Sequence, residues 1–304
     1  MKSILFLLIL LSAIDVSYCQ QKDDPNYDTR IVSAKWMPDG KSILIAVVKF
    51  HKTDNNAPFF SKVFRYELAT HQILPVLNNA SNLSVSPDGN TIAFLKRDDP
   101  KRTDVYFFDL KSKQERFIKT DSMRKSAMEW SPDGKKIAYN VSTGPTGLES
   151  AVEIFVCDLS SGRTKKITNS GGYKCYSPAW SPDSKKIAYY VEKGDHHDQI
   201  WLTDAVGSFH TNLTNDSAHN FFPAWMDNQT IIYNSGGSGI MIMKVNGSNK
   251  QKIDGIDGEG IEYNNKARKF AYVMSEGENQ LVIFDWATKS AKAVLKGNEM
   301  IKVF

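Results

Sequence analysis

Apolar and polar residues alternate in short segments that are separated by turn-forming residues along nearly the whole chain. Successive side chains of a β-strand point to opposite faces, so in one such segment Ile137 and Tyr139 share a face and the small Ala138 lies on the other. The apolar positions after residue 30 show no helical period. This pattern predicts an all-β protein that is built from many short strands.

The segments belong to a repeat. Residues 130–139 read WSPDGKKIAY and residues 180–189 read WSPDSKKIAY, and weaker copies occur elsewhere. Equivalent positions recur roughly every 40 to 50 residues, which is the period of propeller blades. They are occupied by an aromatic or apolar residue in six units: Trp36, Val85, Trp130, Trp180, Trp225 and Tyr263.

Each unit has the features of a four-stranded meander. Ser131-Pro132-Asp133-Gly134 is a tight turn, because proline presets its own φ, serine and aspartate can accept backbone hydrogen bonds, and glycine tolerates a positive φ. Third and fourth strands follow, as at residues 152–159 and 164–168. We therefore expect a six-bladed β-propeller of four-stranded antiparallel blades over residues 20–304, with repeats that begin near residues 31, 80, 125, 175, 220 and 258.

The first residues have the composition of a leader. An apolar run at residues 4–14 follows Lys2, and small residues precede Cys19, so we expect a signal peptide over residues 1–19 that is cleaved after Cys19. This predicts a periplasmic or secreted protein. Cys19 could instead be the lipidated cysteine of a bacterial lipoprotein, although Tyr18 stands where a lipobox normally has glycine or alanine. No other segment is long and apolar enough for a membrane helix.

Composition excludes one class of partner. The chain has 304 residues, of which 41% are hydrophobic, and a formal net charge of +4. Its lysines recur at successive turns, whereas nucleic-acid binding needs a concentrated basic patch. We expect a monomer that binds no nucleic acid.

The sequence WSPDGKKIAY, followed by a strand that ends in Asp-Leu, resembles the TolB-type, WD40-like propeller repeat, and the resemblance covers residues 31–296. It implies a propeller ring, export and protein binding. The N-terminal α/β domain of TolB has no counterpart in this sequence. The same repeat also forms the propeller of prolyl-oligopeptidase-type peptidases, whose nucleophile lies in a separate α/β-hydrolase domain.

In a propeller, the loops that enter each innermost strand lie on one face, around the mouth of the central channel, and the Pro-Asp-Gly turns lie on the other. Channel mouths are concave, and ligands bind preferentially in concave sites. Tyr176 and Phe222 precede Pro178 and Pro223 closely, so we expect these two aromatics in the core. The candidate partner-binding residues are the unusual residues of the mouth loops: Arg97, Tyr173, His196, His197, His219 and Phe221.

The leading hypothesis is a non-enzymatic protein, without metal or cofactor, that binds a protein or peptide at its channel mouth. The alternative is a metal-dependent enzyme acting on glycans or peptides, because His196, His197, His219 and nearby carboxylates could converge on a divalent cation. A carbohydrate-binding propeller is a third possibility, since aromatic residues stack on sugars. Four aspartates recur at the end of the third strand and are expected to cap turns: Asp109, Asp158, Asp204 and Asp285.

Cys157 and Cys175 lie at opposite ends of their predicted strands, so we expect no disulfide between them. Residues 300–304 alternate like a strand that could pair with the first blade and close the ring. Residues 20–30 could do the same from the other end, and the sequence does not choose between them.

Overall fold

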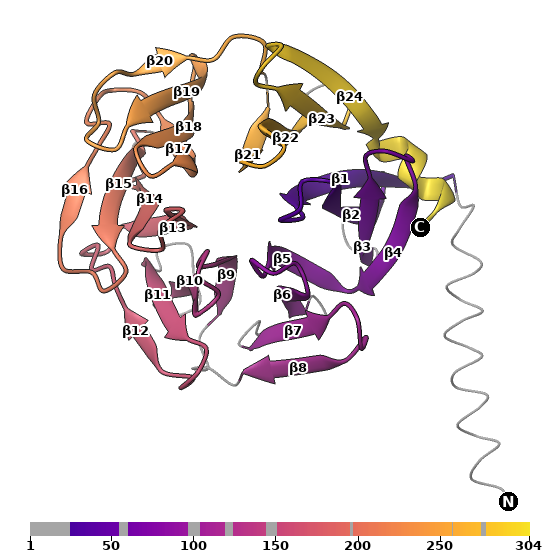
Figure 1. Cartoon of the computed structure of the whole chain (residues 1–304), viewed down its shortest axis with the longest axis horizontal. Coiled ribbons are helices and arrows are strands. Elements are labelled where there is room, and N and C mark those ends of the chain that lie inside the picture. Colours follow the sequence, from indigo (N-terminus) through magenta and orange to yellow (C-terminus); the bar gives the residue numbers. More distant parts are fainter. Residues whose placement is uncertain are drawn as a thin grey trace, which may run out of the picture.

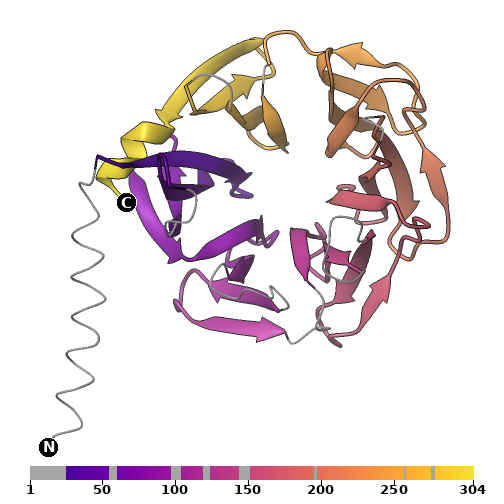
Figure 2. The same ribbon diagram turned by 180° about the vertical axis from the view of Figure 1, so that it is seen from behind.

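The computed structural model describes residues 25–54, 60–96, 104–118, 124–143, 151–194, 197–256, 258–274 and 278–304. Within these ranges the chain forms a ring of antiparallel β-meanders that follow one another in sequence order around a central channel (Figures 1 and 2). The expected leader, residues 1–19, lies outside the described residues. The described residues include no helix long and apolar enough to cross a bilayer.

Four sheets of the ring have four strands each, in sequence order. The first contains β1 (Tyr27–Trp36), β2 (Ser42–His51), β3 (Phe60–Glu67) and β4 (Ile73–Asn78). The second contains β5 (Ala80–Val85), β6 (Thr91–Lys96), β7 (Val105–Asp109) and β8 (Glu115–Ile118). The other two contain β17 (Asn220–Asp227), β18 (Thr230–Ser235), β19 (Gly239–Lys244) and β20 (Gln251–Lys252), and β21 (Glu259–Asn264), β22 (Lys269–Met274), β23 (Gln280–Asp285) and β24 (Ser290–Lys296).

The remaining strands share one eight-stranded sheet. It contains β9 (Lys125–Trp130), β10 (Lys136–Ser142), β11 (Val152–Asp158), β12 (Thr164–Lys166), β13 (Lys174–Trp180), β14 (Lys186–Glu192), β15 (Gln199–Asp204) and β16 (His210–Asn212). A single parallel pair, Val152 with Lys174, joins β11 to β13. The prediction of an all-β propeller with four-stranded antiparallel blades is confirmed, but the described sheets do not divide into six separate blades because of this pair.

The core lies between neighbouring meanders, so a strand in the middle of a meander is buried on both faces. On β6, Ile92 and Phe94 pack in one cluster with residues of β2, whereas Ala93 and Leu95 pack in another with residues of β10. All four side chains are fully buried. This arrangement explains why the second strands have nearly continuous apolar runs, and each large side chain buried in this way contributes about 1.5–3 kcal/mol.

The predicted turn chemistry is present. Gly134 has φ +73°, and the carboxylate of Asp133 accepts hydrogen bonds from Ser131 Oγ (2.6 Å) and from the backbone N–H of Lys135 (3.0 Å). The expected turn cap Asp158 accepts hydrogen bonds from the backbone N–H groups of Ser160 (3.2 Å) and Ser161 (3.0 Å). Hydrogen bonds to its carboxylate, from the Ser160 hydroxyl first, lower the pKa of Asp158.

Three of the four repeat tryptophans join neighbouring inner strands through their indole N–H groups, whereas that of Trp130 is buried without a hydrogen-bond partner among the described residues. The indole N–H of Trp180 donates to the carbonyl of Glu129 (3.1 Å), and that of Trp225 donates to the carbonyl of Ala179 (2.9 Å). Trp36 makes the same contact to Glu262 (3.2 Å) across the junction between the first and last sheets. An aromatic donor at this position therefore holds successive inner strands side by side around the channel.

Among the described residues, the first and last sheets exchange no strand where the ring closes. The last residues form a 3₁₀ helix, η1 (Gly297–Lys302), which lies against β1 (Figure 1). The expectation of a closing strand at residues 300–304 is therefore wrong. Met300 is fully buried and Phe304 is nearly so, because both belong to the apolar cluster between the first and last sheets. The Asn279 side chain also bonds both backbone groups of Ile31, accepting at 2.8 Å and donating at 3.0 Å.

Candidate functional site

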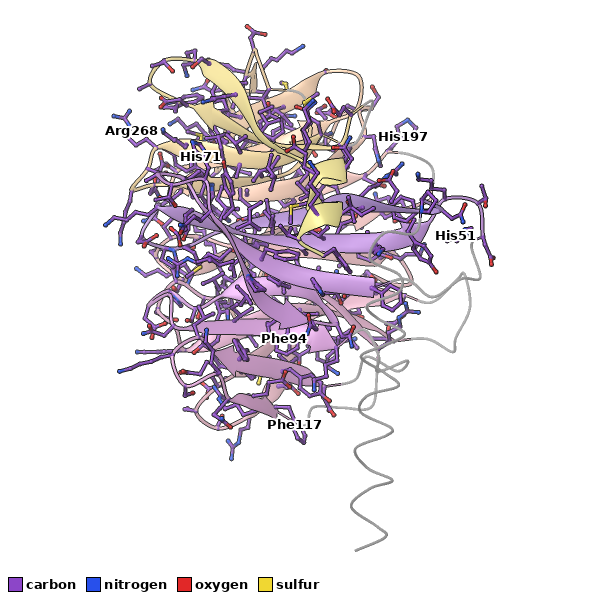
Figure 3. The ribbon with its side chains drawn as sticks, turned by 90° about the vertical axis from the view of Figure 1, so that its right-hand side faces the viewer. His51, His71, Phe94, Phe117, His197 and Arg268 are labelled. Carbon is purple, nitrogen blue, oxygen red and sulfur yellow. The ribbon has the colours of Figure 1, made fainter. Side chains whose placement is uncertain are left out.

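The two faces of the ring differ as the sequence predicts. His197, in a loop before a third strand, lies on one face, and Arg268, in the turn between the first two strands of the last sheet, lies on the opposite face (Figure 3). We call the first the mouth face. The loops and the Pro-Asp-Gly turns are thus separated by the thickness of the ring.

The channel contains a cavity of about 500 Å³. The inner strands β1, β5, β9, β13, β17 and β21 contribute its walls. A second cavity of about 380 Å³ lies beside it between β1, β17 and β21. The two cavities adjoin, since they share the lining residues Ser33, Lys35, Phe222, Gly260 and Glu262.

A bulge interrupts each of these inner strands. The bulged residue has a positive φ in five of them, as for Asn82 (52°), Ala127 (33°), Ser177 (51°), Phe222 (49°) and Gly260 (64°). The strand pairing shifts register at the same places. Bulges bend a strand and re-aim its side chains. All five bulged residues line the main cavity, so the bulges shape its wall.

Three charged side chains line the main cavity. Lys35 on β1 forms an ion pair with Glu262 on β21, and Glu129 on β9 accepts a hydrogen bond at Oε1 from the backbone N–H of Trp180 (3.3 Å). No cation of the described residues lies within ion-pair distance of Glu129. The channel therefore holds two carboxylates and one ammonium group.

The surroundings shift the pKa values of this group. Burial raises the pKa of Glu129 to about 7, because the attraction of Lys35 offsets only part of the burial and the charge of Glu262 adds to the rise. Burial lowers the pKa of Lys35, but the charges of Glu262 and Glu129 outweigh it and the net shift is upward. Glu129 can therefore exchange a proton near neutral pH while Lys35 stays charged.

Sequence reasoning missed these three residues, although a signal for them exists. Each precedes the aromatic position of the repeat, where the inner strand faces the channel axis. The residue at this position changes from unit to unit: Lys35, Ser84, Glu129, Ala179, Ala224 and Glu262. Equivalent positions on an innermost strand converge at the axis of a ring, so charged residues at this one position can meet.

Aromatic rings form a continuous row on the mouth face. The ring centroids of Tyr176 and Tyr190 are 5.5 Å apart, those of Tyr190 and Phe222 5.8 Å, those of Phe222 and Phe221 5.1 Å, and those of Phe221 and His219 4.6 Å. All five side chains are half-buried. We call these five residues the aromatic strip. Phe222, the middle ring of the row, also lines both cavities, so the strip borders the channel at its centre.

The expectation that Tyr176 and Phe222 are core residues is wrong. The bulges of β13 and β17 interrupt the strand pairing next to both residues, and Phe222 is itself a bulged residue with φ +49°. Each ring packs against Tyr190 on the neighbouring strand β14 and remains half-buried. Both aromatics belong to the strip.

The predicted partner-binding residues fall in different places. Arg97 and His196 lie outside the described residues. Tyr173 is 46% exposed, with Lys193 Nζ 5.6 Å from the centre of its ring. His219 and Phe221 lie together in the strip, and His219 Nδ1 is 3.2 Å from Oδ2 of the buried Asp198.

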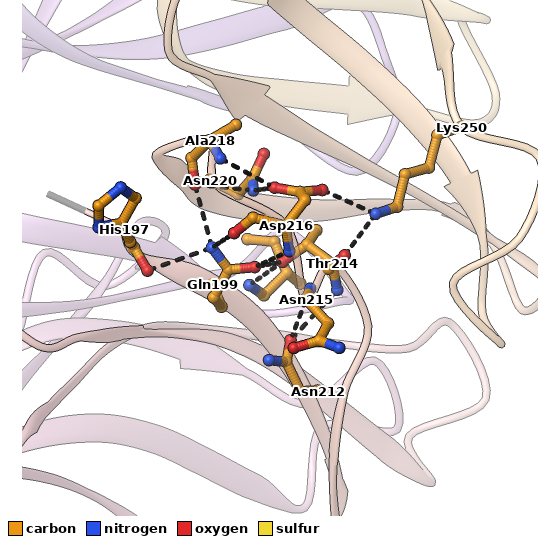
Figure 4. Close-up of polar contacts among 10 residues, drawn as sticks. His197, Gln199, Asn212, Thr214, Asn215, Asp216, Ala218, Asn220 and Lys250 are labelled. Carbon is orange, nitrogen blue, oxygen red and sulfur yellow. Dashed lines mark hydrogen bonds and ion pairs between the residues drawn. The ribbon is translucent and has the colours of Figure 1, made fainter.

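A buried glutamine holds the mouth loop that carries His219 (Figure 4). Gln199 Nε2 donates to the carbonyls of His197 (3.1 Å), Asp216 (2.9 Å) and Ala218 (3.0 Å). Its Oε1 accepts from Thr214 Oγ1 (2.7 Å) and from the backbone N–H of Asp216 (3.1 Å). A buried amide that satisfies this many groups fixes the loop in one conformation.

In the meander β9–β12, a buried carboxylate holds a mouth loop in the same way. Glu153 on β11 is buried and accepts hydrogen bonds from Thr168 Oγ1 and from the backbone N–H of Ser170 (2.9 Å). The loop that it holds continues to Tyr173. The mouth loops that carry Tyr173 and His219 are thus each held by a buried polar side chain, Glu153 and Gln199 respectively.

The metal alternative finds no geometric support in the described residues, which contain no group of three or more His, Cys, Asp or Glu side chains that could hold a cation. His196 lies outside them. The chemistry available in the channel is that of one carboxyl group with a pKa near neutrality, beside a lysine and a second carboxylate.

Comparisons with known proteins agree with this architecture. The family model "TolB beta propeller domain" matches residues 129–300, and the model "Eukaryotic translation initiation factor eIF2A" matches residues 25–193. No curated protein matches the sequence.

Solved structures match the fold at low identity. A putative TolB from Agrobacterium tumefaciens is 18% identical with a TM-score of 0.65, and the match covers 79% of this chain and 90% of that one. TolB from Acinetobacter baumannii is 16% identical with a TM-score of 0.61, covering 88% and 79%. Oligogalacturonate lyase from Vibrio parahaemolyticus is 15% identical with a TM-score of 0.62, covering 90% and 80%. At these identities the likeness shows the fold alone.

Proposed function

Since the chain belongs to the TolB β-propeller family, we propose that it is an exported, non-catalytic propeller that binds an extended segment of a protein or peptide at its channel mouth. The aromatic strip is the observation that carries this proposal. Half-buried aromatic rings are typical anchors at protein interfaces, because they offer a large contact area at a small entropic cost.

The strip is also held rigidly. Gln199 makes four hydrogen bonds to residues 214–218 of the loop that carries His219, and Phe221 and Phe222 lie on β17 itself. A preformed surface loses little conformational entropy when a partner binds, so more of the contact energy becomes affinity.

We further propose that the ring has six blades. β9–β12 and β13–β16 each form a four-stranded antiparallel meander, and one parallel residue pair is their only ladder connection among the described residues. If this pair is counted as a contact between blades, the ring agrees with the six sequence repeats.

Cross-linking pull-down from a bacterial lysate tests the binding proposal. The bait is the chain from Gln20 onward, and the test variant combines Tyr190→Ala with Phe221→Ala. The matched control is Phe117→Ala, which removes a ring that is 56% exposed on β8, at the outer edge of its sheet. We expect a discrete partner with the native bait and the control but not with the folded double variant. Equal capture by all three baits would contradict the proposal.

The second candidate function is an enzyme acting on glycans, and the observation that favours it is Glu129, a carboxyl group with a pKa near 7 inside a cavity. This candidate predicts turnover of oligogalacturonate by the native protein, with a large loss in Glu129→Gln. Binding of glycans without turnover would instead favour a carbohydrate-binding propeller.

A further inference from the structure

We propose that the channel behind the aromatic strip is a binding site for a cationic group, namely a lysine or arginine side chain or a terminal amine of the bound segment, and that Glu129 is its counter-charge. The inference rests on the proposed binding of a protein or peptide segment at the mouth. It adds the chemical class of side chain that this site selects.

The aromatic strip borders the opening of the channel. Phe222 is the middle ring of the strip and lines both cavities. The second cavity shares Lys35 and Glu262 with the main cavity. Successive side chains of an extended segment alternate in direction, so a segment seated on the strip presents every second side chain toward this opening.

The charged side chains that line the main cavity do not neutralise one another. Lys35 is already paired with Glu262, whereas Glu129 receives one backbone hydrogen bond and is not within ion-pair distance of any described cation. When Glu129 is ionised, the three groups carry a net charge of −1. The equivalent positions on the other inner strands are uncharged: Ser84, Ala179 and Ala224. Arg30 lines the second cavity but not the main one, and its guanidinium lies 5.2 Å from the centre of the Phe50 ring, so the balance of −1 is that of the main cavity.

A cationic group of the ligand neutralises the Glu129 carboxylate, whereas an anionic or a neutral group does not. An anionic group would face two carboxylates in a partly desolvated channel, where charges interact more strongly than in water. A neutral guest would remove water from Glu129 without replacing its solvation. A cation provides the missing partner, and hydrogen bonds between oppositely charged groups are the strongest that proteins make.

The raised pKa of Glu129 adds a pH dependence. Without a guest, about half of the Glu129 side chains are protonated near pH 7. A bound cation favours the carboxylate, so binding releases a proton and affinity increases as the pH rises through neutrality. The other titratable groups that line these spaces are Lys35, Glu262, Arg30 and Tyr263. The raised pKa of Lys35 keeps it charged in this interval, and burial raises the pKa of Tyr263, which stays neutral.

Peptide selection tests the inference separately from the proposed function. A library of random short peptides is displayed and selected on the native protein, on Glu129→Gln and on Phe221→Ala. Glutamine keeps the shape of the side chain and its acceptor for the Trp180 N–H but removes the charge. We expect lysine or arginine to be enriched at one position on the native protein, this enrichment to vanish on Glu129→Gln, and all selection to weaken on Phe221→Ala.

Affinities of one enriched peptide complete the test. Replacing its cationic residue by norleucine should weaken binding to the native protein about tenfold and binding to Glu129→Gln less than about twofold. Affinity for the cationic peptide should also be higher at about pH 8 than at about pH 6. Enriched peptides without a cationic residue, or with a carboxylate in its place, would overturn this inference and leave mouth binding intact. No enrichment on the native protein would overturn both.

Discussion

At the scale of single residues, burial decides the chemistry of Glu129. Its carboxyl group lies in the channel wall, where the pKa is raised from 4.5 to about 7. The folded state therefore holds a proton that the unfolded state releases, so this contribution to stability is present below about pH 4.5 and is lost as the pH rises through about 7. The shift corresponds to a free energy on the order of 3 kcal/mol.

Glu129→Gln should remove this dependence. Relative to the native protein, we expect little change in the free energy of unfolding at about pH 4.5 and a gain on the order of 3 kcal/mol at about pH 8.5. Urea denaturation at the two pH values measures both. The control is Glu115→Gln, whose side chain is 39% exposed, and it should change neither value by more than about 0.5 kcal/mol. A variant that is no more stable than the native protein at the higher pH would refute the assignment.

The glycine of the repeat turn has a positive φ, which other residues adopt only with backbone strain. Gly134 has φ +73°, and a Cβ there would meet only Pro87, at 3.9 Å. Space is therefore available, and only backbone strain opposes a side chain. We expect Gly134→Ala to destabilise the protein by about 1–2 kcal/mol, measured by thermal or urea unfolding. Lys135→Ala, in the same turn at an ordinary φ, should have almost no effect, and equal losses in the two variants would argue against strain.

At the scale of elements, η1 replaces a closing strand. Met300 is fully buried between the first and last sheets, whereas the neighbouring Val303 is 42% exposed. The ring depends at this junction on apolar packing, on the Asn279 contacts and on the indole of Trp36. A junction without a shared strand concentrates its stability in a few side chains.

Met300→Ala should therefore destabilise the protein by about 2–4 kcal/mol, because it leaves a cavity at the junction. Val303→Ala is the matched control, one turn away, and should cost less than about 0.5 kcal/mol. Hydrogen exchange adds a local measurement: amides of β1 and β24 should lose protection in Met300→Ala before those of β9 and β10. Uniform loss of protection around the ring would show that the junction is no weaker than the rest.

At the scale of the whole molecule, the packed ring protects both described cysteines. Cys157 and Cys175 are free and buried. Burial is the main cause that raises the pKa of the Cys157 thiol to about 11 and that of Cys175 to about 12. Thiolate is the reactive form, so neither residue should react while the ring is closed.

A thiol reagent such as Ellman's reagent tests this on a Cys19→Ser background at about pH 8. We expect no reaction with the native protein over minutes and reaction of both cysteines in denaturing urea. The rate in intermediate urea should follow global unfolding. A single equivalent that reacts in native buffer would show that one sheet opens independently, and Cys157→Ser would identify which cysteine it is.

The sequence by itself determined the architecture, because repeated elements encode it locally. Both copies of the motif, WSPDGKKIAY and WSPDSKKIAY, contain the turn and the buried strand, and the tryptophan of the second copy joins neighbouring inner strands. Each of these features acts within a few residues of the chain or on the adjacent meander. For the same reason, the division of loops and turns between two faces followed from strand order alone. His219 and Phe221 could be chosen because they interrupt the repeat in a mouth loop.

Which charged side chains lie together in the channel depends on the tertiary structure. Lys35, Glu129 and Glu262 are far apart in sequence and converge because the ring brings inner strands to one axis. A bulge that the residue pattern did not predict makes Phe222, an expected core residue, the ring of the aromatic strip that borders the channel. Ring closure also depends on the tertiary structure, because the alternating pattern of residues 300–304 is compatible with a strand. In the structure, residues 300–302 instead belong to the short 3₁₀ helix η1, and Met300 is buried. Local pattern fixes a strand, but packing between distant segments fixes which side chains share a cavity.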